Sequence, residues 1–327
     1  LVTVTGDNGE EGFGEATILT GYTPETVDGA WAKARELAAA LKGMEAATAK
    51  AEALKHHKAA PFTVTSLVTA IEMAEGSPFL EITRETPVPL LAILSASDEP
   101  GIAREMEQHR AARYGTVKVK VGFDMAADLA GIADLKKTLA ADERLFTDAN
   151  QAWCLEDALT FAKGAREYDL GWLEEPLRAD ARAADWERLA KEGGVPLAAG
   201  ENFTGAPDFD AAIAAKSLAY MQPDMAKWGG VTGCLPVARA ILAGGVTYCP
   251  HYLGGGIGLL ASANLLAAVG GPGLLEVDNN PNPLREGVTG ERIADGQFHL
   301  PDGPGLGIET IPNGLGEHVT LHRIWKA

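Results

Sequence analysis

Short apolar runs recur from residue 87 onward, and amphipathic stretches separate most of them. A short run rich in β-branched residues predicts a strand, whereas apolar positions three or four apart predict a helix. The helical spacing is clearest at 99–113, 125–140 and 155–168. The pattern predicts eight strands separated by seven helical intervals, with the strands at 87–94, 116–122, 144–150, 172–176, 196–202, 219–226, 246–251 and 274–278.

Regular alternation of strands and helices indicates an α/β fold with a parallel sheet, and eight such units close most readily into a barrel. An open doubly wound sheet is the alternative. No GxGxxG motif follows the first strand, which disfavours a dinucleotide-binding sheet of that kind.

The first ninety residues follow a different pattern. Residues 1–16 read as two short strands joined by a turn, and helical stretches follow at 23–43, with Thr23 as the expected N-cap, and at 63–76. The tail is rich in Gly and Pro and is expected to pack back on this N-terminal unit. We therefore expect an α+β capping domain at 1–86, a barrel at 87–290 and a C-terminal segment at 291–327 that joins the cap.

The run at 116–122 places charge where a core strand is expected. Successive side chains of a strand point to opposite faces, so Val117, Val119 and Val121 form one face and Lys118 and Lys120 the other. Two interpretations compete: an edge strand with a solvated face, or a buried strand whose lysines serve a chemical purpose.

Polar residues also end most of the other expected strands. A single one is more often a helix cap or a solvated loop residue, but an apolar parallel strand has no structural need for so many, and burying unpaired charge is costly. In an α/β barrel the active site lies at the carboxyl ends of the strands. The residues at these ends are Lys118, Lys120, Asp148, Asn150, Glu174, Glu175, Glu201, Asn202, Asp224, His251 and Glu276.

Three carboxylates, those of Asp148, Glu174 and Glu201, end successive strands and can converge on one point. Three hard oxygen ligands with open positions suit Mg²⁺, or Mn²⁺ as a substitute. Without a cation they would repel one another and raise their pKa values. No His or Cys stands beside them, so zinc is less favoured.

Candidate bases flank this expected metal site on two sides. Lys118 and Lys120 belong to the second strand, and Asp224 and His251 to the sixth and seventh. A lysine beside a second cation and a metal is expected to have a lowered pKa and so to accept a proton. A carboxylate such as Asp224 orients and charge-balances a catalytic imidazole.

In order and spacing, these motifs resemble those of the enolase superfamily, and more narrowly its mandelate racemase subgroup, which includes muconate lactonizing enzymes. The matching segments are GFGEA, VKVKVG, DAN, WLEEP, GEN, QPDMAKWGG, CPH and LLEVD. The resemblance implies a (β/α)7β modified TIM barrel with an α+β capping domain, one Mg²⁺, and abstraction of the proton α to a carboxylate through a metal-stabilised enediolate.

The resemblance also implies individual roles. Lys120 would be one base and Lys118 its pKa-lowering neighbour, while His251, backed by Asp224, would be the base on the opposite face. Glu276 would hydrogen-bond a substrate carboxylate oxygen. The remaining supporting positions would be Asn150 and Lys227.

One departure from the family pattern concerns the start of the chain. A further strand and a specificity loop normally precede the segment LVTVT, and neither is in this sequence. The chain begins inside an apparent strand without Met, so we expect the true start to lie earlier.

Four functions are compatible with these residues. The first is dehydration of an acid sugar or related 2-hydroxy acid. The second is a racemase or epimerase reaction that uses Lys120 and His251 on opposite faces. The others are a Schiff-base lyase that uses Lys118 or Lys120, and a binding barrel without catalysis.

Charge and cysteine content narrow the partners. The chain has 327 residues and a formal net charge of −17, which argues against nucleic acid or an anionic membrane as the main partner. Cys154, Cys234 and Cys249 lie far apart without a CxxC, which favours free thiols and a cytoplasmic location. The expected partner is a small carboxylate substrate, and the resemblance implies a homo-oligomer.

Overall fold

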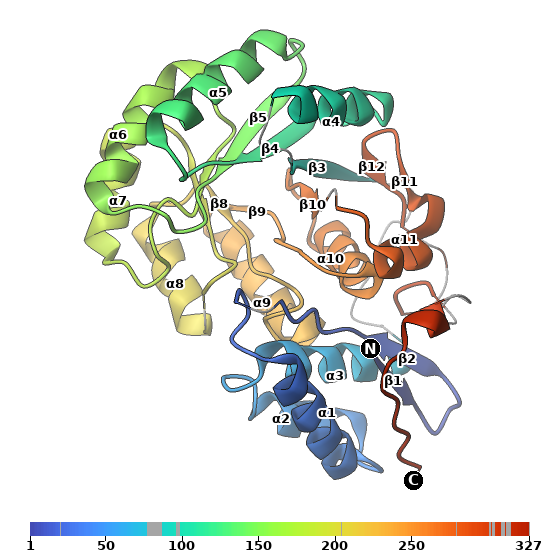
Figure 1. The fold of residues 1–327 in the computed structure, drawn as a ribbon. Coiled ribbons are helices and arrows are strands. Elements are labelled where there is room, and N and C mark those ends of the chain that lie inside the picture. The colour runs from blue at the N-terminus through green and yellow to red at the C-terminus, as the bar shows by residue number, and fades with distance from the viewer. Residues whose placement is uncertain are drawn as a thin grey trace.

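The computed structural model describes the chain except residues 20, 77–86, 96–98, 204, 279, 301, 303–304, 309–310, 312–314 and 327. The described part is an α/β protein in which strands and helices alternate through the middle of the chain (Figure 1). The parallel strands are β3 (Val88–Leu94), β4 (Thr116–Lys120), β5 (Arg144–Asp148), β6 (Leu173–Glu174), β7 (Leu197–Ala199), β8 (Tyr220–Met221), β9 (Thr247–Tyr248) and β10 (Leu275–Val277). The helices between them are α4 (Glu99–Ala111), α5 (Met125–Thr138), α6 (Leu155–Ala165), α7 (Ala183–Gly193), α8 (Ala206–Ala215), α9 (Gly230–Ala243) and α10 (Gly256–Val269).

The strands pair in sequence order, as the alternation predicts. A continuous ladder runs from β3 to β9, and β10 pairs in parallel with β3. Among the described residues no ladder joins β9 to β10, although the two lie together: the Leu274 N–H donates to Cys249 Sγ at 3.3 Å. Sulfur takes the place of a carbonyl acceptor at this contact.

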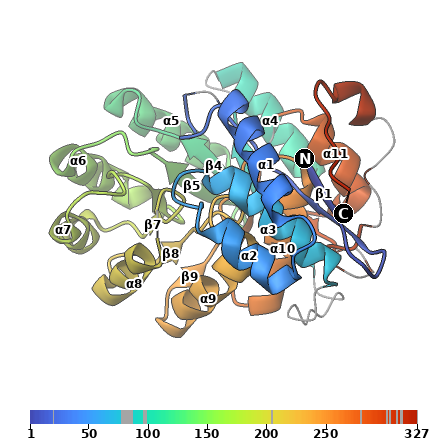
Figure 2. The ribbon, with the colours of Figure 1, turned by 90° about the horizontal axis from the view of Figure 1, so that it is seen from below.

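The N-terminal segment folds into a hairpin and three helices. The hairpin pairs β1 (Val2–Thr5) with β2 (Glu11–Gly14), and the helices are α1 (Val27–Leu41), α2 (Ala46–Leu54) and α3 (Pro61–Ala74). This segment has an apolar cluster of its own, centred on α3. Figures 1 and 2 place α3 beside α9 of the barrel segment. We call residues 1–76 the cap segment.

The predicted cap of the first helix is wrong by three residues. Thr26 is the N-cap, and its side chain accepts from the Gly29 N–H at 3.1 Å. The Thr23 hydroxyl instead contacts the carbonyls of Leu19 and Glu25, so it stabilises the preceding turn.

Two glycines of the GFGEA motif allow β2 to lie against α3. A Cβ at Gly14 would come within 1.8 Å of the Ser66 carbonyl oxygen, which belongs to a helix backbone that cannot move aside. We expect Gly14→Ala to lower the free energy of unfolding by about 1–3 kcal/mol, as overpacking does in a tight core. Chemical denaturation measures this.

The control for that substitution is Gly131→Ala on the exposed face of α5, where an added Cβ meets nothing within 4 Å. This change is expected to leave stability unchanged or to raise it by about 0.5–1 kcal/mol, because Ala has the better helix propensity. Equal denaturation midpoints for the two variants would contradict the packing argument.

The C-terminal tail contacts both the parallel strands and the cap segment. After α11 (Pro283–Thr289) and a 3-10 turn, η2 (Gly290–Arg292), strands β11 (Ile293–Ala294) and β12 (Gln297–Phe298) form a hairpin, and β12 pairs antiparallel with β3. Beyond the last 3-10 turn, η3 (Leu315–His318), the Lys326 carbonyl accepts from Lys42 Nζ at 2.7 Å. The expected domain boundary at residue 86 lies outside the described residues.

The inner face of the parallel strands has an apolar layer. Its residues are Leu91, Phe146, Trp172, Ala198 and Cys249. Side chains two residues further along a strand share its face and lie nearer the carboxyl end. The next inward position after Trp172 is therefore Glu174, and a polar layer begins there.

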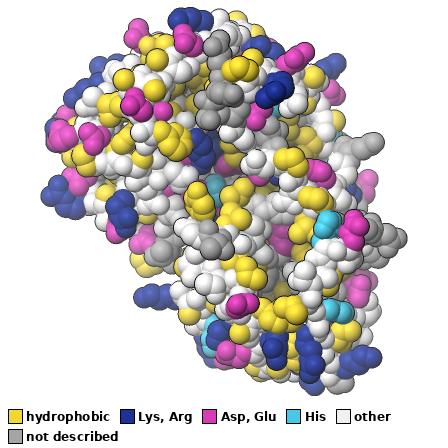
Figure 3. Space-filling view, viewed as in Figure 1, with side chains coloured by type: hydrophobic (Ala, Val, Ile, Leu, Met, Phe, Trp, Pro, Cys, Tyr) yellow, Lys and Arg dark blue, Asp and Glu magenta, His cyan; other side chains and the backbone are white. Residues whose placement is uncertain are grey.

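No helix among the described residues is long and apolar enough to cross a membrane. On the face shown in Figure 3, Lys and Arg side chains are scattered among Asp and Glu rather than gathered into one continuous basic area.

Candidate active site

Lys118 is the centre of a buried ion cluster. Its side chain is 0% exposed, and Nζ lies 2.8 Å from Glu174 Oε1, 2.8 Å from Glu276 Oε1 and 3.4 Å from Asp148 Oδ2. Strand β4 pairs with β3 on one side and β5 on the other, so the edge-strand interpretation is wrong. The lysine points inward because three carboxylates surround it there.

Lys120 lies nearer the mouth of the barrel. Its side chain is 38% exposed, and Nζ lies 2.5 Å from Asp148 Oδ2. Burial lowers the pKa of Lys120, but the charges of Asp148 and Glu174 outweigh both burial and the neighbouring Lys118, so its pKa is raised. The expected lowering of the pKa concerns a lysine beside a bound metal ion, and it stays a prediction.

The carboxyl groups outnumber the lysines in this cluster. Burial, and next the charge of Asp148, raise the pKa of Glu174 to about 8, whereas burial is outweighed at Asp148, whose pKa is lowered by Lys118 and Lys120. Lys118 stays charged, since its carboxylate neighbours raise its pKa against the effect of burial. Glu174 is the group that holds a proton near neutral pH.

Removing the central cation should destabilise the fold. In Lys118→Met, Glu174 and Glu276 stay buried without a positive partner, so the free energy of unfolding should fall by about 3–5 kcal/mol. Urea denaturation of the metal-free protein measures the change. The matched control is Lys137→Met, which breaks a pair with Asp134 on the exposed side of α5 and should leave the midpoint in place; equal shifts would contradict the buried-cluster account.

A second polar group follows the ends of β8 and β9. His251 Nδ1 is 2.7 Å from Asp224 Oδ2, and Nε2 is 2.5 Å from Glu201 Oε2. Burial lowers the pKa of His251, but the charges of Glu201 and Glu276 raise it by more than burial lowers it. The pKa of His251 therefore lies well above the usual value. An imidazole between two carboxylates holds both ring protons. This arrangement confirms the expected contact between Asp224 and His251.

Lys227 contacts Glu201 and Asp224, and Asn150 contacts Asp148. Lys227 Nζ lies 3.2 Å from the Glu201 carbonyl oxygen and 3.8 Å from Asp224 Oδ2. The Asn150 backbone N–H donates to Asp148 Oδ1 at 2.9 Å, and Asn150 has the left-handed φ of 49°. Their assigned supporting roles stay predictions.

Among the described residues, no three His, Cys, Asp or Glu side chains are arranged to hold a metal ion together. Each predicted ligand instead contacts a cation: Asp148 contacts Lys120, Glu174 contacts Lys118, and Glu201 contacts His251. Their role as metal ligands stays a prediction.

Several buried oxygens of the site lack a partner. Glu175 Oε1, Glu276 Oε2 and Gln222 Oε1 have no hydrogen-bond partner among the described residues. Burial, and next the charge of Glu201, raise the pKa of Glu175 to about 8. Unpaired buried oxygens are costly, so the arrangement suits a ligand that supplies positive charge or donors.

The analysis of the sequence missed two residues of this layer. Trp172 Nε1 donates to Glu174 Oε2 at 2.9 Å, and Gln222 Nε2 donates to the same oxygen at 2.8 Å. Each lies two positions before a residue that was singled out, Glu174 and Asp224. The alternation rule that grouped the lysines would have found both.

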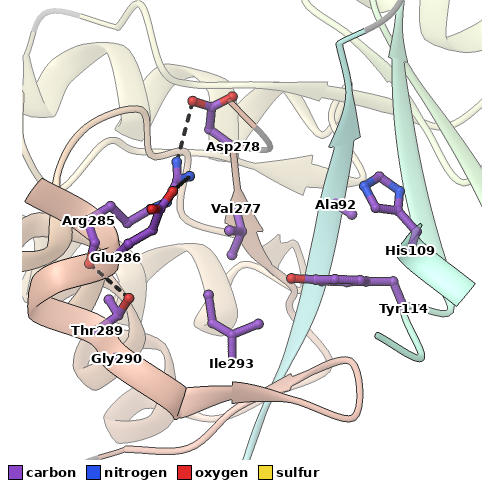
Figure 4. Close-up of a pocket in the computed structure, with 10 residues that line it drawn as sticks. All are labelled: Ala92, His109, Tyr114, Val277, Asp278, Arg285, Glu286, Thr289, Gly290 and Ile293. Carbon is purple, nitrogen blue, oxygen red and sulfur yellow. Dashed lines mark hydrogen bonds and ion pairs between the residues drawn. The ribbon is translucent and has the colours of Figure 1, made fainter. Parts of the chain in front are cut away.

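A cavity of about 230 Å³ lies away from this site, on the outer side of β3 and β10 (Figure 4). None of the predicted site residues lines it. In Figure 4, Arg285 projects from α11 and pairs with Asp278 across its upper edge. Its lining residues are Ala92, His109, Tyr114, Val277, Asp278, Arg285, Glu286, Thr289, Gly290 and Ile293.

Known proteins are similar to this chain in sequence and in fold. The family described as "Enolase C-terminal domain-like" matches residues 101–313. A D-galactarolactone cycloisomerase of Agrobacterium fabrum is 31% identical over 66% of this chain and 59% of its own length. An arabinonate dehydratase of Saccharolobus solfataricus is 29% identical over 62% of this chain and 54% of its length. The matches therefore span little more than half of these two curated relatives.

A solved structure matches over most of both chains. It is described as mandelate racemase/muconate lactonizing enzyme from Bordetella bronchiseptica, is 36% identical, covers 94% of this chain and 90% of its own, and has a TM-score of 0.83.

Proposed function

Because the chain belongs to the enolase C-terminal domain-like family, within the mandelate racemase and muconate lactonizing enzyme branch of the enolase superfamily, we propose that it removes the proton α to a carboxylate with the help of Mg²⁺. The reaction we favour is dehydration of an acid sugar or related 2-hydroxy acid. One observation carries the proposal: separate proton-transfer groups border the same set of buried carboxylates. Lys120 ends β4, and the Asp224–His251 pair follows β8 and β9.

The residues present fit a divalent cation by their donor set and charge. Asp148, Glu174 and Glu201 supply hard oxygens, and burial, with the charge of Asp148 next, raises the pKa of Glu174. Members of the superfamily bind Mg²⁺, or Mn²⁺ in its place on chemical grounds. Bound there, the cation would neutralise the three carboxylates and polarise a substrate carboxylate.

Lys120 is the proposed base. The contact with the Asp148 carboxylate favours the protonated form of Lys120, so the amine must separate from that carboxylate and lose its proton before it accepts one from the substrate. Lys118 then favours the neutral amine, since its fixed positive charge lowers the pKa of Lys120. Glu174 and Glu276 keep Lys118 charged throughout.

His251 is the proposed acid in dehydration. Lys120 takes the α-proton, and the C–H electrons pass into the substrate carboxylate to give an enediolate. The β-C–O bond then breaks, and His251 gives a proton to the departing hydroxyl, which leaves as water. The resulting enol takes up a proton from solvent at the β-carbon and loses its hydroxyl proton, which gives a 2-keto acid. Asp224 Oδ2, at His251 Nδ1, holds the ring with Nε2 directed to the site.

The test is incubation with Mg²⁺ and a panel of aldonic and aldaric acids, arabinonate among them. A 2-keto acid product supports dehydration. Loss of the α-proton to deuterated solvent without a keto product supports the second candidate, a racemase or epimerase. Turnover that resists chelation, together with a borohydride-trapped adduct on Lys118 or Lys120, would contradict the metal mechanism and indicate a Schiff-base lyase. Inertness toward the whole panel together with no binding of Mg²⁺ would indicate a binding barrel.

Replacement of His251 separates the two reactions. His251→Asn is expected to abolish keto-acid formation while α-proton exchange on the Lys120 side continues at a reduced rate, because the asparagine cannot protonate a leaving hydroxyl. Proton NMR in deuterated water follows both quantities. Undiminished keto-acid formation in this variant would contradict the role of His251.

The finer architecture belongs to the same proposal. We infer a closed (β/α)7β barrel over residues 87–290, with a capping domain formed by 1–86 and 291–327. The β10–β3 ladder and the Leu274–Cys249 contact support closure, and the Lys42–Lys326 contact supports a tail that joins the cap.

A further inference from the structure

The cap segment holds the loop that follows β8 at several backbone atoms. The Gly229 N–H donates to Thr65 Oγ1 at 2.9 Å, and the Lys227 carbonyl lies 2.6 Å from His57 Nε2. Glu72 accepts from the Val231 N–H at 3.0 Å and the Thr232 N–H at 2.6 Å. These are the first amides of α9, which lack partners within their own helix.

A second cap carboxylate holds the loop that follows β9. Glu15 accepts from the Ile257 N–H at 3.2 Å and the Gly258 N–H at 3.1 Å, at the start of α10. The Tyr252 hydroxyl also contacts Glu15 Oε1 and lies 2.8 Å from the Gly255 carbonyl oxygen. Tyr252 directly follows His251, so this loop is tied to the cap one residue beyond the proposed acid.

The described hydrogen bonds from the cap segment reach loops on one side of the candidate site. Among the described residues, the hydrogen bonds from residues 1–76 to the loops of the barrel strands all end on segments 227–232 and 252–258. Figure 1 places α3 beside α9. Among the described residues, these hydrogen bonds therefore hold the side of the site that carries Asp224 and His251.

The held loops are continuous with the Asp224–His251 pair. Asp224 Oδ1 accepts from the Ala226 N–H at 2.7 Å, and its carbonyl accepts from the Lys227 and Trp228 amides at 3.1 and 3.0 Å. The loop held by Glu72 thus begins at the carboxylate that orients His251. An isolated bridge joins residues 224 and 251 in parallel, so the two loops leave the barrel together.

We propose that Glu72 and Glu15 are positioning residues, which fix the loops after β8 and β9 and thereby set the Asp224–His251 contact. The proposal rests on the proposed function only for its effect on catalysis. Both carboxylates are buried, at 3% and 7% exposure, and each sits where a helix start offers free N–H donors and positive potential. They join the cap to the catalytic centre through the backbone, without contact with the substrate.

The cap segment supplies a matched control. Glu25 is also 7% exposed and also occupies a helix start, where it accepts from the Phe62 N–H at 2.7 Å. That helix is α3, inside the cap. Glu25→Gln removes a buried capping charge of the same kind without touching either barrel loop.

The experiment compares Glu72→Gln, Glu15→Gln and Glu25→Gln in the full chain. We expect the first two to speed amide hydrogen exchange at 229–232 and 257–258 respectively by about 10-fold or more, since the loss of one hydrogen bond corresponds to roughly that factor. We also expect both to shift the ¹⁵N signals of the His251 ring. Glu25→Gln should change neither. If a carboxylate variant fails to fold, the same measurements are made on Thr65→Val and Tyr252→Phe, each of which removes one hydroxyl that joins the cap to a loop.

With an active substrate from the panel, kcat should fall by about 10-fold in Glu72→Gln with KM nearly unchanged, because the ring is displaced and the substrate contacts are not. His251 ring signals that move no more than in Glu25→Gln would overturn the positioning role. A wild-type protein without activity would contradict the proposed function but not the positioning role. Amide hydrogen exchange and the ¹⁵N signals of the His251 ring are measured without turnover.

Discussion

Lys120→Ala is expected to slow loss of the substrate α-proton by about 10²–10⁴-fold, the range that a positioned general base contributes. The amine lies at the barrel mouth with Asp148 as its contact, so its removal takes away the proton acceptor. Proton NMR in deuterated water measures the rate. Small primary amines added to the variant should restore part of it, because they can enter the space that the side chain leaves.

The fold should survive this change. The Lys120 side chain is 38% exposed, unlike that of Lys118, which is fully buried. Circular dichroism and the thermal midpoint should therefore match the wild-type protein within a few degrees. Wild-type exchange rates in Lys120→Ala would contradict the role of Lys120 as the base.

Glu201→Gln is expected to weaken Mg²⁺ binding by more than about 10-fold and to abolish turnover, because it removes a proposed metal ligand. Even the loss of a residue that only hydrogen-bonds a metal ligand typically weakens metal binding by about 10-fold or more. Calorimetric titration of Mg²⁺ into the metal-free protein measures the first effect. The substitution also removes the charged partner of His251 Nε2.

Glu175→Gln is the matched control. Glu175 is buried beside Glu201, and Asn202 Nδ2 donates to both side chains. The pKa of Glu175 is raised to about 8, so at pH 7 it is largely protonated and a glutamine resembles it closely. We expect it to bind Mg²⁺ as the wild-type protein does. Equal binding by both variants would remove Glu201 from the ligand set.

Strand positions and inward faces could be predicted because they depend on a period of two along a single strand. Lys118, Asp148 and Glu174 all point inward as the alternation required. Trp172 and Gln222 obey the same rule and were missed because a polar layer was sought only in charged residues.

Which cation each carboxylate contacts could not be predicted. That choice depends on side-chain reach and on the charge balance of the whole cluster. In this arrangement burial lowers the pKa of Lys120, and the charge of Asp148 outweighs burial and raises it. The close approach of Gly273 to β9, where an added Cβ would meet the Tyr248 carbonyl oxygen at 2.0 Å, likewise depends on tertiary packing.

The roles of Glu15 and Glu72 also lay beyond sequence reasoning. Glu72 falls within a helical run and Glu15 just after a strand, and either position is common for a solvated carboxylate. Only the approach of the cap segment to α9 and α10 buries them. Long-range contacts of this kind leave no periodic signal in the chain.

The central claim is metal-dependent removal of an α-proton. Its most direct test follows the α-C–H signal of each aldonic and aldaric acid by proton NMR in deuterated water, with Mg²⁺, after exhaustive chelation, and after Mg²⁺ is restored. The account predicts that at least one acid loses this signal with Mg²⁺, keeps it after chelation, and loses it again on restoration. Turnover that retains the α-hydrogen, or that proceeds equally well after chelation, would contradict it.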